Sequence, residues 1–253
     1  MLVPPALLSL AFIAATPASP LDLDEYEWRL TRHTRFRYAA DLDAIKRRGV
    51  LRVLTRNNSV SYYISRGKER GFEFELASAF AEALGVRVAF VVPQRRGRLM
   101  SALFDGEGDL IAAGMSVTPA RSEKLVFTKP YISTQRVVAT RQGLGKRISS
   151  LEDLLDVEIH LSFRSTTMQD ARGVEAELGR KLQLQDVTDG AEMELMMERV
   201  VKGDYEATIV DDVLLGLEQV AGLPLEGTVA IGEQRSKAWA VHPAAPNQPC
   251  LST

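Results

Sequence analysis

The sequence predicts an α/β protein made of two similar lobes, each a parallel sheet with helices on both faces. Strand-like apolar runs alternate with runs at helical spacing from residue 41 onward, and the same order begins again after residue 145. The chain has 253 residues, of which 45% are hydrophobic and 25% charged, so it can bury a sizeable core. Two such lobes in one chain predict a ligand cleft between them.

The first lobe is expected over residues 41–137, with a return segment at 232–243. Its boundaries follow from glycines that end helices and from short apolar strands. In chain order we expect a helix from 42 that Gly49 closes, a strand over 50–55, a helix over 77–84 that Gly85 ends, a strand over 86–92, a helix over 99–104, and strands at 110–113 and 137–139.

The second lobe is expected over residues 138–231. Its methionines, Met193, Met196 and Met197, fall on one face of an amphipathic helix and are interpreted as core residues. In chain order we expect a serine-capped helix over 149–155, a strand over 157–161, a helix from 168, a strand over 182–187, a helix over 191–201, a strand over 207–210, a helix over 213–220 and a last strand that returns to the first lobe.

The two ends of the chain differ from its body. Residues 7–15 are almost wholly apolar and are followed by small residues and prolines, so residues 1–20 are interpreted as a signal peptide and the protein as exported. Residues 21–40 are interpreted as an extension or linker. The proline-rich stretch over 244–253 is interpreted as an irregular tail of a truncated chain, because a closing helix is expected after the last strand.

The composition argues against several classes of partner. The net charge is −2 and basic and acidic residues are interspersed, which disfavours nucleic-acid binding. The three histidines and the single cysteine lack metal-ligand spacing. We therefore expect no metal and no cofactor.

The most informative motif lies at 108–121, where an apolar run ends in small and hydroxyl residues before a proline and an arginine. Gly114 allows a ligand close to the backbone, Ser116 offers a hydroxyl, and Pro119 can begin a helix whose first amides lack partners. Arg121 adds a planar guanidinium that suits a carboxylate. These residues predict a carboxylate receptor, and the alternative is a surface turn with a solvated arginine.

From residue 41 to 243 the chain resembles the amino-acid type of periplasmic solute-binding protein, with a two-lobed fold of type II. The resemblance rests on segments 49–53, 71–77, 113–121, 127–131 and 205–211, in this order and spacing. More narrowly, segments 51–55 and 61–63 are similar to the regulatory module of membrane-bound lytic transglycosylase F. No segment of this chain corresponds to the lysozyme-like catalytic domain of that family.

The resemblance implies a role for each of seven residues. Arg121 and Ser116 would bind the α-carboxylate of a ligand, the Gly114 carbonyl would accept from its α-ammonium, and Asp211 would balance that ammonium. From the second lobe, Thr166 and Ser165 would offer hydroxyls and helix-start amides, and Tyr62 would form an aromatic wall. Asp211 has the alternative of a helix N-cap, and Tyr62 that of a core tyrosine with a bonded hydroxyl.

We therefore expect a non-catalytic, exported solute-binding or sensor protein of the periplasm that binds an amino acid or a short peptide such as a muropeptide. Its partners would be an ABC transporter or a cell-wall enzyme. Arg56, at a position that is often acidic or small in the family, favours an acidic or peptide ligand. Two enzymatic alternatives remain: a lytic transglycosylase remnant without its catalytic domain, and a dehydratase on the same fold, for which Asp211 or Glu75 would be the candidate acid.

Overall fold

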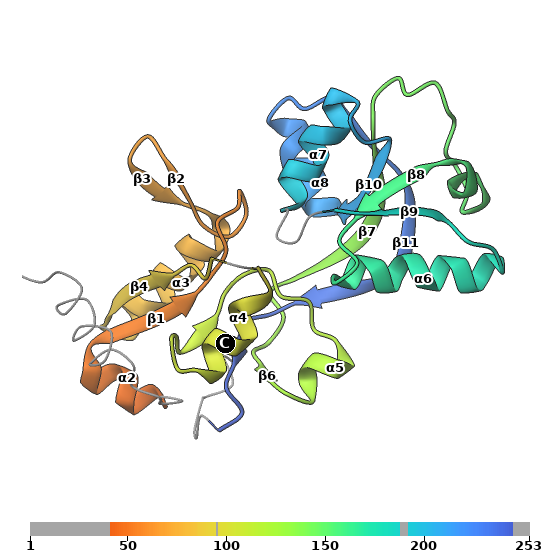
Figure 1. Cartoon of the computed structure of the whole chain (residues 1–253). Coiled ribbons are helices and arrows are strands. Elements are labelled where there is room, and N and C mark those ends of the chain that lie inside the picture. Colours follow the sequence, from red (N-terminus) through yellow and green to blue (C-terminus); the bar gives the residue numbers. More distant parts are fainter. Residues whose placement is uncertain (1–40, 95, 188–191, 245–253) are drawn as a thin grey trace, which may run out of the picture. The chain divides into compact units, whose positions relative to one another are not determined.

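The structure is a computed structural model that describes residues 41–94, 96–187 and 192–244. The expected signal peptide, the linker over 21–40 and the tail beyond Ala244 lie outside these residues. The described residues form two five-stranded sheets and one hairpin (Figure 1).

The first sheet is mixed rather than wholly parallel. Strand β1 (Val50–Leu54) pairs in parallel with β4 (Arg87–Val91) and β5 (Leu110–Ile111). The returning strand β12 (Ala240–Val241) runs antiparallel between β5 and β6 (Val126–Phe127). The chain enters this sheet a last time from the opposite direction, which the alternation of helices and strands does not predict.

Three helices pack on the first sheet: α2 (Leu42–Arg48), α3 (Phe72–Ala83) and α4 (Leu99–Phe104). Asp41 caps α2, since its carboxylate accepts from the Ala44 amide at 2.7 Å, and Gly49 ends it at φ 71°. Helix α3 begins five residues before the predicted start. Its N-cap is Gly71, at φ 130°, where a Cβ atom would lie 2.3 Å from the Ser61 carbonyl oxygen.

The second sheet has the order β11–β7–β10–β8–β9. Strands β10 (Ala207–Asp211), β8 (Glu158–Leu161) and β9 (Gln183–Asp186) are parallel. Strands β7 (Ile132–Arg141) and β11 (Leu225–Lys237) run side by side and antiparallel (Figure 1). The predicted strand at 137–139 is only the middle of β7, and β11 is much longer than the sequence pattern indicates.

The helices of the second lobe are α6 (Thr166–Leu178), α7 (Met193–Lys202) and α8 (Asp212–Val220). Helix α6 begins two residues before the predicted start. The predicted serine-capped helix at 149–155 is instead a 3₁₀ turn, η2 (Glu152–Asp156), in which the Asp153 carboxylate accepts from the amides of Ser149 and Ser150.

Both sheets are covered on both faces, as predicted. Neighbouring residues of one strand, such as Leu110 and Ile111 in β5 or Ile209 and Val210 in β10, join different apolar clusters because successive side chains point to opposite faces. The methionines of α7 are buried, which confirms their interpretation as core residues.

Three short elements complete the described chain. The hairpin of β2 (Tyr63–Ser65) and β3 (Lys68–Arg70) follows β1. A 3₁₀ turn, η1 (Arg96–Arg98), precedes α4, and the one-turn helix α5 (Pro119–Ser122) lies between β5 and β6. Helix α5 carries the arginine of the predicted receptor motif.

Candidate ligand-binding site

Arg121 is held at the end of α5 with its guanidinium turned back toward the preceding loop. Pro119 occupies the first turn of this helix, as predicted, and Thr118 is its N-cap. One Arg121 nitrogen donates to the Ser116 carbonyl at 2.9 Å. The pKa of Arg121 is lowered, first by burial and then by the nearby cations Arg56, Arg136 and Arg235. Among the described residues no ion pair of Arg121 with a carboxylate is found.

Gly114 and Ser116 lie in the same loop. Gly114 adopts φ 59° and has open space beside its Cα atom, so a ligand could approach its backbone. Ser116 is 3% exposed, and its hydroxyl accepts from the Lys237 ammonium at 2.9 Å. The structure therefore brings Gly114, Ser116 and Arg121 together, as the motif predicts.

Asp211 ends β10 and stands at the N-cap position of α8, but it does not cap that helix. Its carboxylate accepts from the Lys237 ammonium at 3.0 Å, from Arg136 at 3.1 Å and from the Thr134 hydroxyl at 3.0 Å. Burial acts to raise the pKa of Asp211, but Lys237 and Arg136 outweigh it and hold this pKa below its ordinary value.

Thr166 joins this group through Arg136, whose second terminal nitrogen donates to the Thr166 hydroxyl at 3.2 Å. Ser165 is the N-cap of α6, and its hydroxyl donates to the Ser162 carbonyl at 2.6 Å rather than to the helix amides. Ser165 also contacts the Thr167 hydroxyl. The hydroxyl pair therefore lies where the sequence predicts it, although Ser165 bonds within its own loop.

Tyr62 is not brought into this group. Its ring stacks on Phe90 at a centroid distance of 5.3 Å and packs against Phe74, and its hydroxyl donates to Glu69 at 2.7 Å. The ring is half-buried and its hydroxyl is bonded at the surface, so Tyr62 is not the fully buried core residue of the alternative. Its role as a wall over a ligand stays a prediction.

Sequence reasoning missed four charged residues that surround the predicted ones. Lys237 is 5% exposed at the end of β11, and Arg136 is 4% exposed in β7. Asp170 in α6 pairs with Arg235 and lies 3.7 Å from Arg136. Burial raises the pKa of Asp170, and the two arginines only partly offset it. We call the set Arg56, Arg121, Arg136, Arg235 and Lys237, with the carboxylates Asp170 and Asp211, the basic cluster.

Glu73 was missed as well, and it holds the loop of Gly114 in place. It is fully buried in α3, and its carboxylate accepts from the Gly114 amide at 2.7 Å, from the Tyr131 hydroxyl and from the Trp239 indole at 2.7 Å. These contacts fix the backbone of Gly114 relative to α3. The sequence signal was a glutamate between two phenylalanines at the start of a helix.

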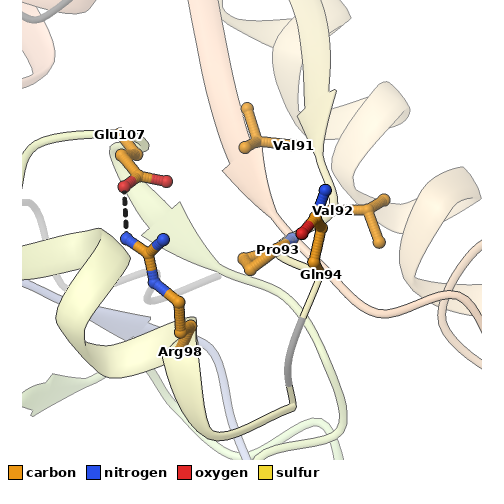
Figure 2. Close-up of a pocket in the computed structure, with 6 residues that line it drawn as sticks. All are labelled: Val91, Val92, Pro93, Gln94, Arg98 and Glu107. Atoms are coloured by element: carbon orange, nitrogen blue, oxygen red, sulfur yellow. Dashed lines mark hydrogen bonds and ion pairs between the residues drawn. The ribbon is translucent and has the colours of Figure 1, made fainter.

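A cavity of about 480 Å³ lies elsewhere in the first lobe, at the end of β4. Val91, Val92, Pro93, Gln94, Arg98 and Glu107 line it, and Arg98 pairs with Glu107 at 2.8 Å across it (Figure 2). None of these residues belongs to the basic cluster, so the cavity is separate from the predicted site.

The basic cluster has the chemistry of an anion receptor. Its cations outnumber its carboxylates, and Arg121 presents a guanidinium with unfilled donors beside a buried serine hydroxyl. Within the described ranges, no group of His, Cys, Asp and Glu side chains has the geometry of a metal site. The helices among these residues are all too short or too polar to cross a bilayer.

The sequence matches the family of bacterial extracellular solute-binding proteins, family 3, over residues 51–220. Two curated relatives are membrane-bound lytic murein transglycosylase F from Ectopseudomonas mendocina and from Stutzerimonas stutzeri, each 30% identical over 203 residues. Each match covers 80% of this chain and 41% of the relative. The chain therefore spans about two-fifths of the length of these relatives.

Solved structures share the fold. The ancestral amino acid-binding protein AncCDT-1, a precursor of cyclohexadienyl dehydratase, matches with a TM-score of 0.69 and 26% identity over 81% of this chain and 87% of that one. An ancestral arginine-binding protein bound to arginine matches with a TM-score of 0.63 and 26% identity over 78% and 85%. The P235GK mutant of ArgBP from T. maritima, at 22% identity, has a TM-score of 0.65 over 81% and 86% and shows the fold alone.

These matches confirm the two-lobed α/β fold of the periplasmic binding proteins. The family match runs from β1 to α8, short of β11 and β12, and includes the loop of Arg121 and the end of β10 at Asp211. The chain belongs to the bacterial extracellular solute-binding proteins of family 3.

Proposed function

We propose that this protein is an exported solute-binding or sensor module that binds an amino acid or a small cell-wall peptide at the basic cluster, between the lobes. The observation that carries the proposal is Arg121, a largely desolvated guanidinium that faces three other arginines and has no carboxylate partner among the described residues. A ligand carboxylate would relieve this repulsion and fill the free donors of the guanidinium.

The ligand class follows from the relatives. Proteins that bind amino acids share the fold, and the transglycosylase F relatives point to short peptides of the cell wall as the other candidate. A module that senses such a peptide would act on a cell-wall enzyme, and one that delivers an amino acid would act on an ABC transporter. The family supports a location in the cell envelope, and export through residues 1–20 is part of the proposal.

Binding is favoured over catalysis because the candidate acids lack a suitable environment. Asp211 is held ionised at neutral pH by Lys237 and Arg136, and Glu75 is exposed on α3. Asp170 has a raised pKa, but its side chain is 2% exposed and lies against Arg235 and Arg136, which keeps it from a substrate. We therefore propose that the chain binds its ligand without turning it over.

A thermal-shift screen tests the ligand class. Free amino acids, short peptides and muropeptides should stabilise the purified protein, and neutral sugars should not. A ligand at about 100 times its dissociation constant adds about 2.7 kcal/mol to the free energy of unfolding. A screen in which sugars are active and every carboxylate-bearing ligand is silent would contradict the proposal.

Substitution of Arg121 tests the site. Truncating one partner of a buried charged pair costs about 2 to 5 kcal/mol, so Arg121→Ala should weaken binding of the best ligand at least about thirtyfold. Arg121→Lys keeps the charge but loses the planar pair of donors, so its affinity should lie between those of Arg121→Ala and the wild type. Calorimetric titration measures both affinities.

The matched control is Arg199→Ala, because Arg199 is an exposed arginine that pairs with Asp204 at the surface and lies outside the basic cluster. It should leave the affinity unchanged. Wild-type affinity in Arg121→Ala would remove the main support for the site, whereas loss of affinity in both variants would point to a general effect of charge.

A further inference from the structure

Lys237 links the two sides of the basic cluster from a fixed backbone. It is the last residue of β11, where it pairs with Ile132 of β7, and it forms a bridge with Ser116. The flanking amide of Ala238 donates to the Met115 carbonyl at 3.1 Å, and the Tyr131 amide donates to the Lys237 carbonyl at 3.1 Å. The position of the Cα atom is therefore set by both neighbouring segments.

The ammonium of Lys237 lies between the two groups that a zwitterionic ligand would need. It donates to the Ser116 hydroxyl at 2.9 Å and to Asp211 at 3.0 Å. Because the hydroxyl of Ser116 only accepts from Lys237, its own proton stays available for a ligand carboxylate. Asp211, in contrast, already has a positive charge in hydrogen-bond contact.

Three carboxylates at the cluster, those of Asp211, Asp170 and Glu192, are paired with cations of the protein. Asp211 contacts Lys237 and Arg136, and Asp170 contacts Arg235 and Arg136. Glu192, at the start of α7, lies 3.7 Å from Arg56. A ligand ammonium that approached Asp211 would therefore meet Lys237 and Arg136, and like charges at such distances cost several kcal/mol.

We propose that this site selects a carboxylate whose adjacent carbon carries no ammonium group, because Lys237 supplies that positive charge from within the protein. N-acylated amino acids, carboxyl ends of peptides and simple dicarboxylates share this chemistry. The inference rests on the proposed function and narrows its ligand class. The surplus of arginines favours a ligand with a second negative charge.

The protonation state of Lys237 is consistent with this role. Burial lowers its pKa, and Asp211 opposes the effect, so that the pKa is about 8. The ammonium form is therefore the main species at pH 7. Lys237 faces Asp211 on β10, Arg136 on β7 and Arg56 in the loop after β1, and it also interacts electrostatically with Asp170 on α6.

Calorimetric titration of the wild type at pH 7 tests the proposal. The three ligands are glutamate, N-acetylglutamate and glutarate, with the two amino-acid ligands used as racemates. We expect N-acetylglutamate to bind at least about tenfold more tightly than glutamate. Glutarate, which has no nitrogen, distinguishes simple dicarboxylates from acylated ligands. If it binds as well as N-acetylglutamate, the site takes carboxylates in general. If it binds much more weakly, the site recognises the acylated nitrogen of a peptide.

Lys237→Met then restores an unpaired face of Asp211 while Arg136 and Thr134 still hold it. This variant should bind glutamate more tightly and N-acetylglutamate no better, so that the preference falls at least about tenfold. Lys237→Gln, which keeps a donor to Ser116, should show the same change if Lys237→Met does not fold. Lys202→Met, at the exposed end of α7, is the control and should keep the wild-type preference.

A wild type that binds glutamate as tightly as N-acetylglutamate, with no change in Lys237→Met, would overturn this inference and leave the proposed function intact. The proposed function fails by a different result, in which every carboxylate-bearing ligand of the thermal-shift screen is silent or Arg121→Ala binds its ligand with wild-type affinity. A preference for N-acetylglutamate that survives in Lys237→Met would also overturn the role of Lys237.

Discussion

Glu73 and Asp211 are two buried carboxylates beside the same loop, and the protein satisfies them in opposite ways. Glu73, in the first lobe, accepts three hydrogen bonds from neutral donors, those of Gly114, Tyr131 and Trp239. Asp211, at the end of β10 in the second lobe, is paired with Lys237 and Arg136.

The two arrangements have different consequences. The neutral donors of Glu73 tie three separate segments to α3, so this carboxylate fixes the shape of the loop that carries Ser116 and Arg121. The cations around Asp211 more than neutralise it, which leaves a net positive environment for an anion. The first carboxylate therefore supports the site, and the second sets its charge.

The largest effect that this comparison predicts is on stability. Glu73→Ala leaves three buried donors without an acceptor and creates a cavity, so the free energy of unfolding should fall by about 3 to 5 kcal/mol. Urea unfolding of the variant measures this loss. Glu75→Ala, an exposed glutamate of the same helix, should change stability by less than about 0.5 kcal/mol.

A loss below about 1 kcal/mol in Glu73→Ala would contradict its role as the support of the loop. An equal loss in Glu75→Ala would assign the effect to the charge of α3 as a whole.

The same comparison explains what the sequence could and could not predict. Local signals were sufficient for α2, where Asp41 and Gly49 cap the helix, and for the strand that ends at Asp211. The receptor motif was also local, since Gly114, Ser116 and Arg121 lie within eight residues of one another.

The partners of those residues were not predictable from local patterns. Lys237 reaches Ser116 across 121 positions, and Trp239 reaches Glu73 across 166. The residues next to Lys237 in the sequence do not indicate which carboxylate it pairs with, because this pairing depends on how β11 crosses between the sheets. Arg136 likewise follows three polar residues of β7 and precedes the apolar run at 137–139, so its burial was not marked by the local pattern.

The second prediction concerns pH. The pKa of Lys237 is about 8 in the folded protein against 10.5 for an ordinary lysine, so between these values the unfolded chain binds more protons than the folded chain. The free energy of unfolding contributed by Lys237 is therefore constant below about pH 8 and rises toward pH 10.5. The difference between wild type and Lys237→Met should increase by about 3 kcal/mol across this interval.

Chemical denaturation at a series of pH values measures this difference, and groups that titrate in both proteins cancel in it. Lys202→Met, whose lysine is exposed, should show a flat difference from the wild type. A difference between wild type and Lys237→Met that falls as the pH rises would mean that the ion pair with Asp211 outweighs the burial of Lys237.

The smallest predicted effect is the loss of stability when one hydroxyl donor is removed from Glu73 or from Asp211. Tyr131→Phe removes a hydroxyl from Glu73, and Thr134→Val removes a hydroxyl from Asp211. Leaving a buried hydrogen-bonding group without its partner costs about 1 to 3 kcal/mol, and no ion pair of Glu73 is found among the described residues, so Tyr131→Phe should cost about 2 kcal/mol. Asp211 keeps Lys237 and Arg136, so Thr134→Val should cost about 1 kcal/mol or less. Urea unfolding of the two variants under one set of conditions gives the comparison directly, and a larger loss in Thr134→Val would mean that the neutral donor, rather than the cations, holds Asp211 in place.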